Sequence, residues 1–148
     1  MMQQNKSAGF TLVEMLLSVV SIALISGISV PVYNSFQTKN DMDVAVNVIA
    51  QKFHRAQILS RNGEGDSSWG VYLDNNGVIL FQGTNFLTRD NTKDESFEFL
   101  TEITPSGLTE VVFEKRSGNP EIFGTVTLTN MVNRVRTLSI NKKGMIEY

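Results

Sequence analysis

The sequence predicts an α+β fold, in which a long N-terminal helix packs on an antiparallel β domain made of one sheet or two. Three observations predict it: an apolar run over residues 10–32, apolar residues at helical spacing over 33–62, and short period-two segments between turns over 63–148. We expect the first segment to be the membrane-spanning half of the helix and the second to be its amphipathic half. The 148 residues suffice for one β domain besides this helix.

The segment from Phe10 to Val32 carries the strongest signal. It is about 23 residues long and contains one charged residue, Glu14. A helix of about 20 apolar residues crosses the hydrocarbon core of a bilayer, because each residue adds about 1.5 Å. A carboxylate there costs about 2.5–3.5 kcal/mol on insertion scales, so Glu14 should have a partner. If the chain were cut after Gly9, the new α-amine of Phe10 would be close enough along the chain to pair with Glu14.

Two residues should loosen this helix near its far end. Gly27 has high backbone freedom, and Pro31 lacks the N–H that would bond to the carbonyl of residue 27. We therefore expect helix flexibility at Gly27 and Pro31. The serines along the run are small enough to let neighbouring helices approach closely.

The stretch Gly9-Phe10-Thr11-Leu12-Val13-Glu14 resembles the class III signal of type IV prepilins and type II secretion pseudopilins. The resemblance implies that a prepilin peptidase removes the leader, residues 1–9, and methylates the new N-terminal Phe10. It implies that Glu14 aids docking of the subunit into a helical filament. Pro31 falls where many of these proteins carry a helix-loosening proline.

The same resemblance implies a pilin-like fold and a location. The chain would pass once through the cytoplasmic membrane, with its N-terminus in the cytoplasm, and would later enter an extracytoplasmic filament. Its partners would be the prepilin peptidase, other pilin or pseudopilin subunits, and the inner-membrane assembly platform.

Two other interpretations of the N-terminal run are weaker. An ordinary secretory signal has an apolar region of about 7–15 residues, which is shorter than this run. A plain membrane anchor explains the length of the run and the single positive charge of Lys6, but it does not explain Glu14 inside the run.

The second half of the helix should place one apolar stripe on the β domain. His54 lies beside this stripe, and we interpret it as a boundary residue and not as a ligand. Arg61-Asn62-Gly63 should end the helix, with Asn62 or Gly63 as a left-handed cap. The stripe recurs at spacings of three and four and consists of Met42, Ala45, Val46, Ile49, Phe53 and Ala56.

From Gly65 onward the hydrophobic period changes to that of strands. The clearest hairpin joins 68–73 and 78–82 around the turn Asp74-Asn75-Asn76-Gly77. We expect residues 85–95 to form a polar loop. Further strands are predicted over 97–100, 109–115, 122–129, 134–141 and 145–148.

The globular part is similar to the minor pseudopilin H and FimT (GspH/FimT) group. Three stretches carry this diffuse resemblance, namely Phe53-His54-Arg55-Ala56-Gln57, Trp69-Gly70-Val71-Tyr72, and the closing segment 136–146. The resemblance implies two packed β-sheets against the helix, in place of the single sheet of major pilins.

Composition and spacing exclude most kinds of chemical site. The chain has no cysteine and one histidine, which excludes disulfides, thiolate chemistry and histidine-rich metal centres. No catalytic or phosphate-binding motif occurs, so we expect no enzyme activity and no cofactor. The Asp74 turn begins like a calcium loop but lacks the distal acidic ligand. Asp90, Asp94 and Glu95 could chelate calcium, although a solvated acidic loop is the stronger interpretation and we predict no metal site.

Arg134, Arg136, Lys142 and Lys143 make the C-terminal end locally basic. Some FimT-like minor pilins bind DNA through a basic C-terminal region. Arg134 and Arg136 share one strand face and could both meet a phosphate backbone. Solvated side chains are the stronger interpretation, because the patch is small and lacks an aromatic platform.

These features together predict a structural subunit, a minor pilin or pseudopilin, of a type IV pilus or a type II secretion pseudopilus. Two alternatives remain. The chain could be a DNA-binding minor pilin for DNA uptake, or a membrane-anchored envelope domain that does not polymerise. Retention of residues 1–9 in the mature protein would favour the anchored domain.

Overall fold

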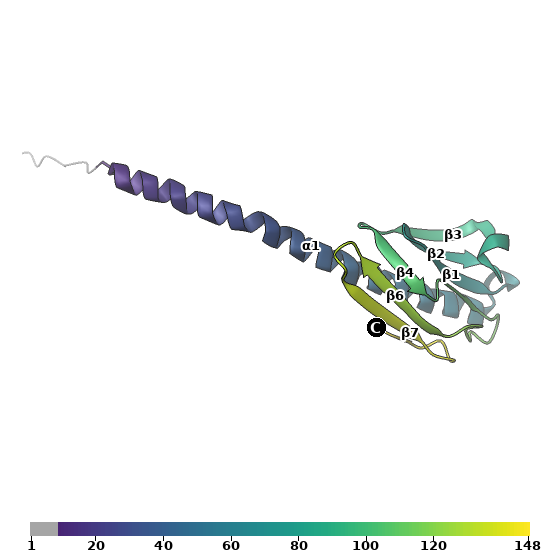
Figure 1. Cartoon of the computed structure of the whole chain (residues 1–148). Helices are drawn as coiled ribbons and strands as arrows, with labels where there is room; N and C mark the ends of the chain where they lie inside the picture. The colour runs from purple at the N-terminus through teal and green to yellow at the C-terminus, as the bar shows by residue number, and fades with distance from the viewer. Residues whose placement is uncertain (1–8) are drawn as a thin grey trace, which may run out of the picture. The chain divides into compact units, whose positions relative to one another are not determined.

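The computed structural model describes the backbone of residues 9–148 and the side chains of residues 9–27 and 40–148. The chain divides into two compact units, an N-terminal unit (Met1–Gln37) and a C-terminal unit (Thr38–Tyr148). One helix, α1 (Leu12–Asn62), contributes to both units, and the strands belong to the C-terminal unit (Figure 1).

The C-terminal unit contains two antiparallel sheets of four strands each. The first sheet has the order β3-β2-β1-β5 and the second has the order β4-β6-β7-β8. Of the two arrangements left open by the sequence, the two-sheet one is observed. The strands are β1 (Trp69–Leu73), β2 (Gly77–Gln82), β3 (Asp90–Glu98), β4 (Ile103–Gly107), β5 (Glu110–Phe113), β6 (Gly124–Asn130), β7 (Val135–Ile140) and β8 (Ile146–Glu147), with short 3₁₀ turns η1 (Glu64–Asp66) and η2 (Phe86–Thr88).

The predicted amphipathic stripe of α1 is confirmed. All six of its residues are at most 5 % exposed and belong to one core cluster with inward side chains of both sheets. Phe53 is fully buried and meets the Phe113 ring of β5 edge to face, with ring centroids 6.5 Å apart. The helix ends as predicted, because Gly63 adopts a left-handed conformation with φ of 69°.

The predicted β1–β2 hairpin is also confirmed. The strands pair from Trp69↔Gln82 to Leu73↔Val78. At the turn, a carboxylate oxygen of Asp74 accepts hydrogen bonds from the N–H groups of Asn76 at 2.9 Å and Gly77 at 2.8 Å. This side-chain bond explains the turn, since aspartate closes such turns by binding the backbone two residues on.

The polar loop expected over 85–95 is wrong. After η2 the chain forms the nine-residue strand β3, which pairs with β2 and lies at the edge of the first sheet. Most of its side chains are exposed, so burial imposes no apolar alternation on them. Charged residues on an edge strand also discourage pairing with other chains, and this makes the strand resemble a loop in sequence.

The membrane-spanning half predicted over residues 10–32 is corrected by the structure. Among the helical residues that the structure describes, none forms a stretch both long enough and apolar enough to cross a membrane. The pilin-like fold with a spanning helix, the transmembrane assignment and the single-pass location in the cytoplasmic membrane are therefore not supported.

Candidate functional site

The predicted cleavage site lies immediately before α1. Gly9 and Phe10 are both exposed, and the Phe10 side chain is 84 % accessible. Apart from the chain neighbours of Gly9, no atom of a described residue lies within 4 Å of the position that a Cβ on Gly9 would occupy. The structure thus leaves the Gly9–Phe10 peptide bond open to a protease, while residues 1–8 of the predicted leader lie outside the described residues.

Glu14 closes the first turn of α1 through Thr11. Its carboxylate accepts a hydrogen bond from the Thr11 N–H at 2.8 Å and another from the Thr11 hydroxyl at 2.9 Å. The Thr11 hydroxyl oxygen in turn accepts from the Glu14 N–H at 3.3 Å. This reciprocal arrangement is a capping box, which the sequence prediction missed although its Thr-x-x-Glu signature is readable in the sequence.

The capping box also favours the ionised form of Glu14. The hydrogen bond from the Thr11 N–H, with the bond from its hydroxyl, lowers the pKa of Glu14 from its ordinary value of 4.5. The carboxylate is therefore ionised at neutral pH and lies at the helix end nearest to Phe10. An ionised carboxylate is also favoured there by the partial positive charge of a helix N-terminus.

Over residues 12–25, α1 presents apolar side chains around its whole circumference. Two serines interrupt this surface, and both satisfy their hydroxyls within the helix. Ser18 donates to the carbonyl of Glu14 and Ser21 to the carbonyl of Leu17, each at 2.8 Å. Ten large apolar residues are between 46 % and 76 % exposed, namely Leu12, Val13, Met15, Leu16, Leu17, Val19, Val20, Ile22, Leu24 and Ile25.

The flexibility predicted at Gly27 and Pro31 stays a prediction. α1 continues through both positions. Gly27 is exposed, and apart from its chain neighbours and the backbone of its own helix no described atom lies within 4 Å of the position of an added Cβ. The side chain of Pro31 lies outside the described residues.

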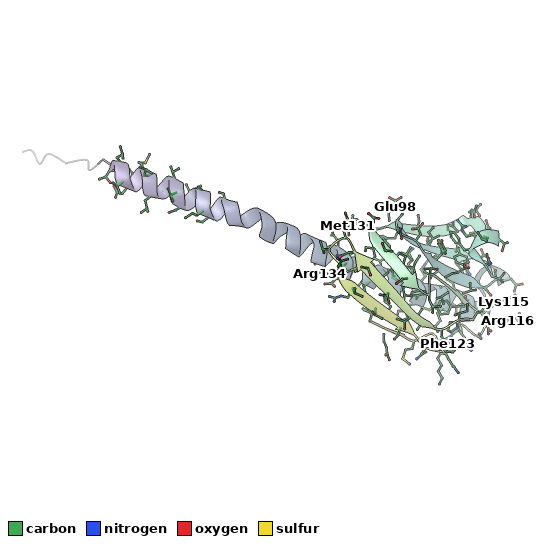
Figure 2. All side chains as sticks on the ribbon, viewed as in Figure 1. Glu98, Lys115, Arg116, Phe123, Met131 and Arg134 are labelled. Carbon is green, nitrogen blue, oxygen red and sulfur yellow. The ribbon has the colours of Figure 1, made fainter. Side chains whose placement is uncertain are left out.

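The structure separates the four basic residues named for nucleic acid. Arg134 precedes the six-residue strand β7 and Lys142 follows it, so the two lie eight residue steps apart, or roughly 26 Å for extended chain. Arg136 is paired with Asp43 of α1, with 3.1 Å between Nη2 and Oδ1. Lys142 lies over the Phe123 ring, 5.1 Å from its centroid, and Figure 2 shows Phe123 well apart from Arg134 in the C-terminal unit. These cations, with Lys143 beside Lys142, do not form one patch.

The carboxylates considered for calcium already have partners on β3, on α1 and at Arg89, which follows η2. Asp90 accepts from the Thr92 N–H and hydroxyl, and Asp94 pairs with Arg89 at 2.8 Å. Glu95 pairs with Arg55 of α1 at 2.6 Å and with Lys52 at 3.3 Å. Within the described ranges no group of three or more acidic, histidine or cysteine side chains could hold a metal ion.

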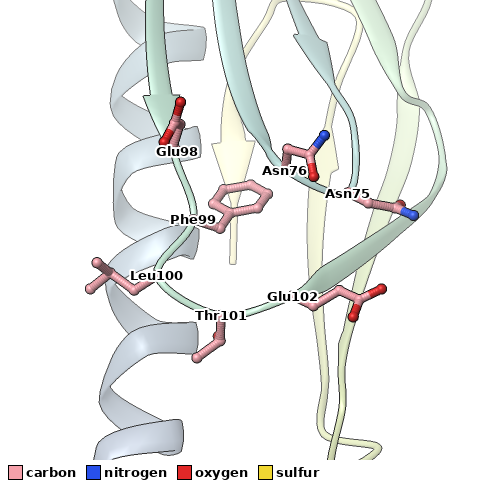
Figure 3. Close-up of a pocket in the computed structure, with 7 residues that line it drawn as sticks. All are labelled: Asn75, Asn76, Glu98, Phe99, Leu100, Thr101 and Glu102. Carbon is pink, nitrogen blue, oxygen red and sulfur yellow. The ribbon is translucent and has the colours of Figure 1, made fainter.

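One cavity of about 520 Å³ opens where the β1–β2 turn meets the connection from β3 to β4 (Figure 3). Asn75 and Asn76 line one side, and residues 98–102 line the other. Glu98 and Glu102 lie on opposite sides of the Phe99 ring, so they do not converge on one point (Figure 3). This arrangement gives polar groups for hydrogen bonding but no paired carboxylates for acid–base chemistry.

The candidate site best defined by the structure is thus the N-terminal segment: the exposed Gly9–Phe10 bond, the Thr11–Glu14 capping box and the apolar surface of residues 12–25. No family model matches the chain, and the comparisons with curated proteins and with solved structures gave no match either.

Proposed function

We propose that this chain is a structural subunit of a helical filament of the type IV pilus or type II secretion class, cut by a prepilin peptidase between Gly9 and Phe10. The observation that carries the proposal is the surface of α1 over residues 12–25. Ten large apolar side chains are exposed there on every side of the helix.

Such a surface needs a cover that surrounds it. A helix that is apolar all round is normally buried, and a continuous exposed apolar patch marks an interaction site. A single neighbouring helix would cover one stripe only. The packing of several copies around one another, as in the core of a filament, would cover the whole circumference.

The polar groups of this segment support its burial among other helices. A buried hydroxyl without a hydrogen bond is costly, but the hydroxyls of Ser18 and Ser21 already bond to carbonyls of their own helix. The Glu14 carboxylate has two donors from Thr11. Its charge still requires a cation, and the α-amine that cleavage would create on Phe10 is the nearest candidate along the chain.

Processing is tested by intact-mass spectrometry of the protein from its native cell. The proposal predicts a mature chain that lacks residues 1–9 and carries one methyl group on the amine of Phe10. Gly9→Val should leave the chain uncut, because the larger side chain blocks the scissile position. A chain that still begins at Met1, in a cell whose other prepilins are cleaved, would overturn the proposal.

A pair of Glu14 variants separates the charge of this residue from its capping role. Glu14→Gln keeps a side-chain acceptor that suits a capping box, whereas Glu14→Leu removes both acceptor and charge. If the charge pairs with an amine during assembly, both variants should be processed but absent from sheared filaments. Normal incorporation of Glu14→Gln would leave only the capping role.

A further inference from the structure

The strand β7 has an open edge in the second sheet. It pairs with β6 from Val135 to Ile140, but it pairs with β8 only at Ser139↔Glu147 and Ile140↔Ile146. Residues 135–137 therefore have a neighbouring strand on one side only. An unpaired edge of this kind is a template for an added strand.

The hydrogen bonds at the two ends of β7 identify which backbone groups face the open side. The Arg134 carbonyl accepts from Asn130 at the end of β6, and the Asn141 N–H donates to Met145 on the β8 side. Backbone groups of successive residues point to alternate sides of a strand. Arg136 thus bonds toward β6, whereas the N–H and C=O groups of Val135 and Thr137 face outward, and no hydrogen bond to a described residue engages them on that side.

A groove of about 510 Å³ borders this open edge. Asp43, Val46 and Asn47 of α1 form one wall, and Val46 at its base is buried. Arg136, Thr137 and Tyr148 form the other wall. All six residues belong to the C-terminal unit, and the ion pair between Asp43 and Arg136 joins the two walls.

The charged residues beside the open edge of β7 determine which kind of strand could pair with it. Arg134 and Arg136 share one strand face, and no described acidic side chain pairs with Arg134. Arg136 pairs with Asp43, but the two side chains are 47 % and 43 % exposed, and such pairs contribute little stability. Antiparallel pairing of two β7 strands would bring arginines together, and like charges across a strand pair are unfavourable. The edge therefore disfavours β7 of a second copy and favours an acidic strand.

We propose that the open edge of β7 binds an extended peptide segment of a partner protein whose acidic side chains alternate with β-branched ones. The acidic side chains would lie opposite Arg134 and Arg136. The β-branched side chains would lie beside Val135 and Thr137 on the outer face, where such residues pack well. This surface belongs to Thr38–Tyr148 and does not depend on the filament proposal.

The test uses the full-length chain in a non-ionic detergent and two fluorescein-labelled hexapeptides, Thr-Glu-Val-Glu-Val-Glu and Thr-Lys-Val-Lys-Val-Lys. Fluorescence anisotropy should detect saturable binding of the glutamate peptide and at least tenfold weaker binding of the lysine peptide. Thr137→Pro removes an outward N–H without removing a bond to β6, and it should weaken binding at least tenfold. The matched control Thr137→Val keeps the N–H and should bind within twofold of the wild type.

Amide hydrogen exchange of the wild-type chain gives a second readout that does not require a folded proline variant. The glutamate peptide should slow exchange at Val135 and Thr137 by at least tenfold and leave Arg136, already bonded to β6, unchanged. Equal binding of both peptides, or no protection at Val135 and Thr137, would overturn the proposal. Self-association of the chain without peptide, abolished by Thr137→Pro, would assign the edge to a second copy instead.

Discussion

Replacement of Phe53 by alanine should remove a large part of the stability of the C-terminal unit. Phe53 is fully buried where α1 meets the sheets, and its ring packs edge to face against Phe113. A buried Phe→Ala change costs about 3–5 kcal/mol, from lost apolar burial and from the cavity that remains. An edge-to-face ring contact contributes about 0.5–1.5 kcal/mol beyond burial, which favours the upper part of that range.

The assay is thermal and urea unfolding of the full-length chain in a non-ionic detergent, followed by circular dichroism. At about 4 °C per kcal/mol for a unit of this size, Phe53→Ala should lower Tm by roughly 15 °C. His54→Ala is the matched control, because His54 is adjacent in the chain but exposed, and its change should stay within about 0.5 kcal/mol. A loss below about 1 kcal/mol for Phe53→Ala would refute the packing of α1 on the sheets.

Three further predictions concern the C-terminal unit. The hydrogen bonds and charge of Arg55, with Lys52, hold the pKa of Glu95 below its ordinary value of 4.5. The ionised Glu95 therefore stabilises the fold above pH 4.5, and this stabilisation is lost as the pH falls through the lowered pKa. The difference in Tm between the wild type and Glu95→Gln should accordingly shrink below pH 4.5. Ser60→Ala should cost about 1–3 kcal/mol in urea unfolding, because the buried Ser60 hydroxyl oxygen accepts from the Trp69 N–H at 2.8 Å and no other acceptor would replace it. Because the carboxylates of β3 already have partners, neither calcium nor a chelator should shift Tm by more than about 1 °C, and a larger shift with calcium would reveal a metal site.

The parts of the fold that sequence predicted are those in which burial forces a period on the chain. The stripe from Met42 to Ala56 faces the core of both sheets, so its spacing of three and four is visible in the sequence alone. The β1–β2 hairpin was equally readable, because Asp74 and Gly77 supply the chemistry that a tight turn requires.

The strand β3 was missed because it lies at the edge of its sheet, where burial does not impose a hydrophobic period on the sequence. Its outward side chains meet solvent, and the long-range partners of Glu95 on α1 are 43 and 40 residues away in sequence. The pairing of Arg136 with Asp43, 93 residues apart, was hidden for the same reason. Such contacts follow from the tertiary arrangement and have no local signature.

At the candidate site, the sequence indicated which residues matter but not their contacts. Gly9, Phe10 and Glu14 were singled out by the motif and by the lone charge in an apolar run. After cleavage the carboxylate was expected to pair with the amine of Phe10, and in the uncut chain it bonds Thr11. The capping box was missed because a lone carboxylate in an apolar run was interpreted only as half of an ion pair, and its hydrogen bonds to a residue three positions earlier were not considered.

The central claim, that residues 12–25 of α1 are covered by helices of other subunits, is tested most directly by site-specific photo-crosslinking in the native cell. Benzoyl-phenylalanine is placed at Leu16 on the apolar surface and, as a control, at the exposed Thr88 of η2. The account predicts a ladder of crosslinked oligomers from position 16, with mass spectrometry locating the adducts in residues 10–27 of another copy or in the corresponding helix of another filament subunit. Position 88 should give no adduct to such a helix. Monomers alone from position 16, in cells that assemble filaments, would contradict the account.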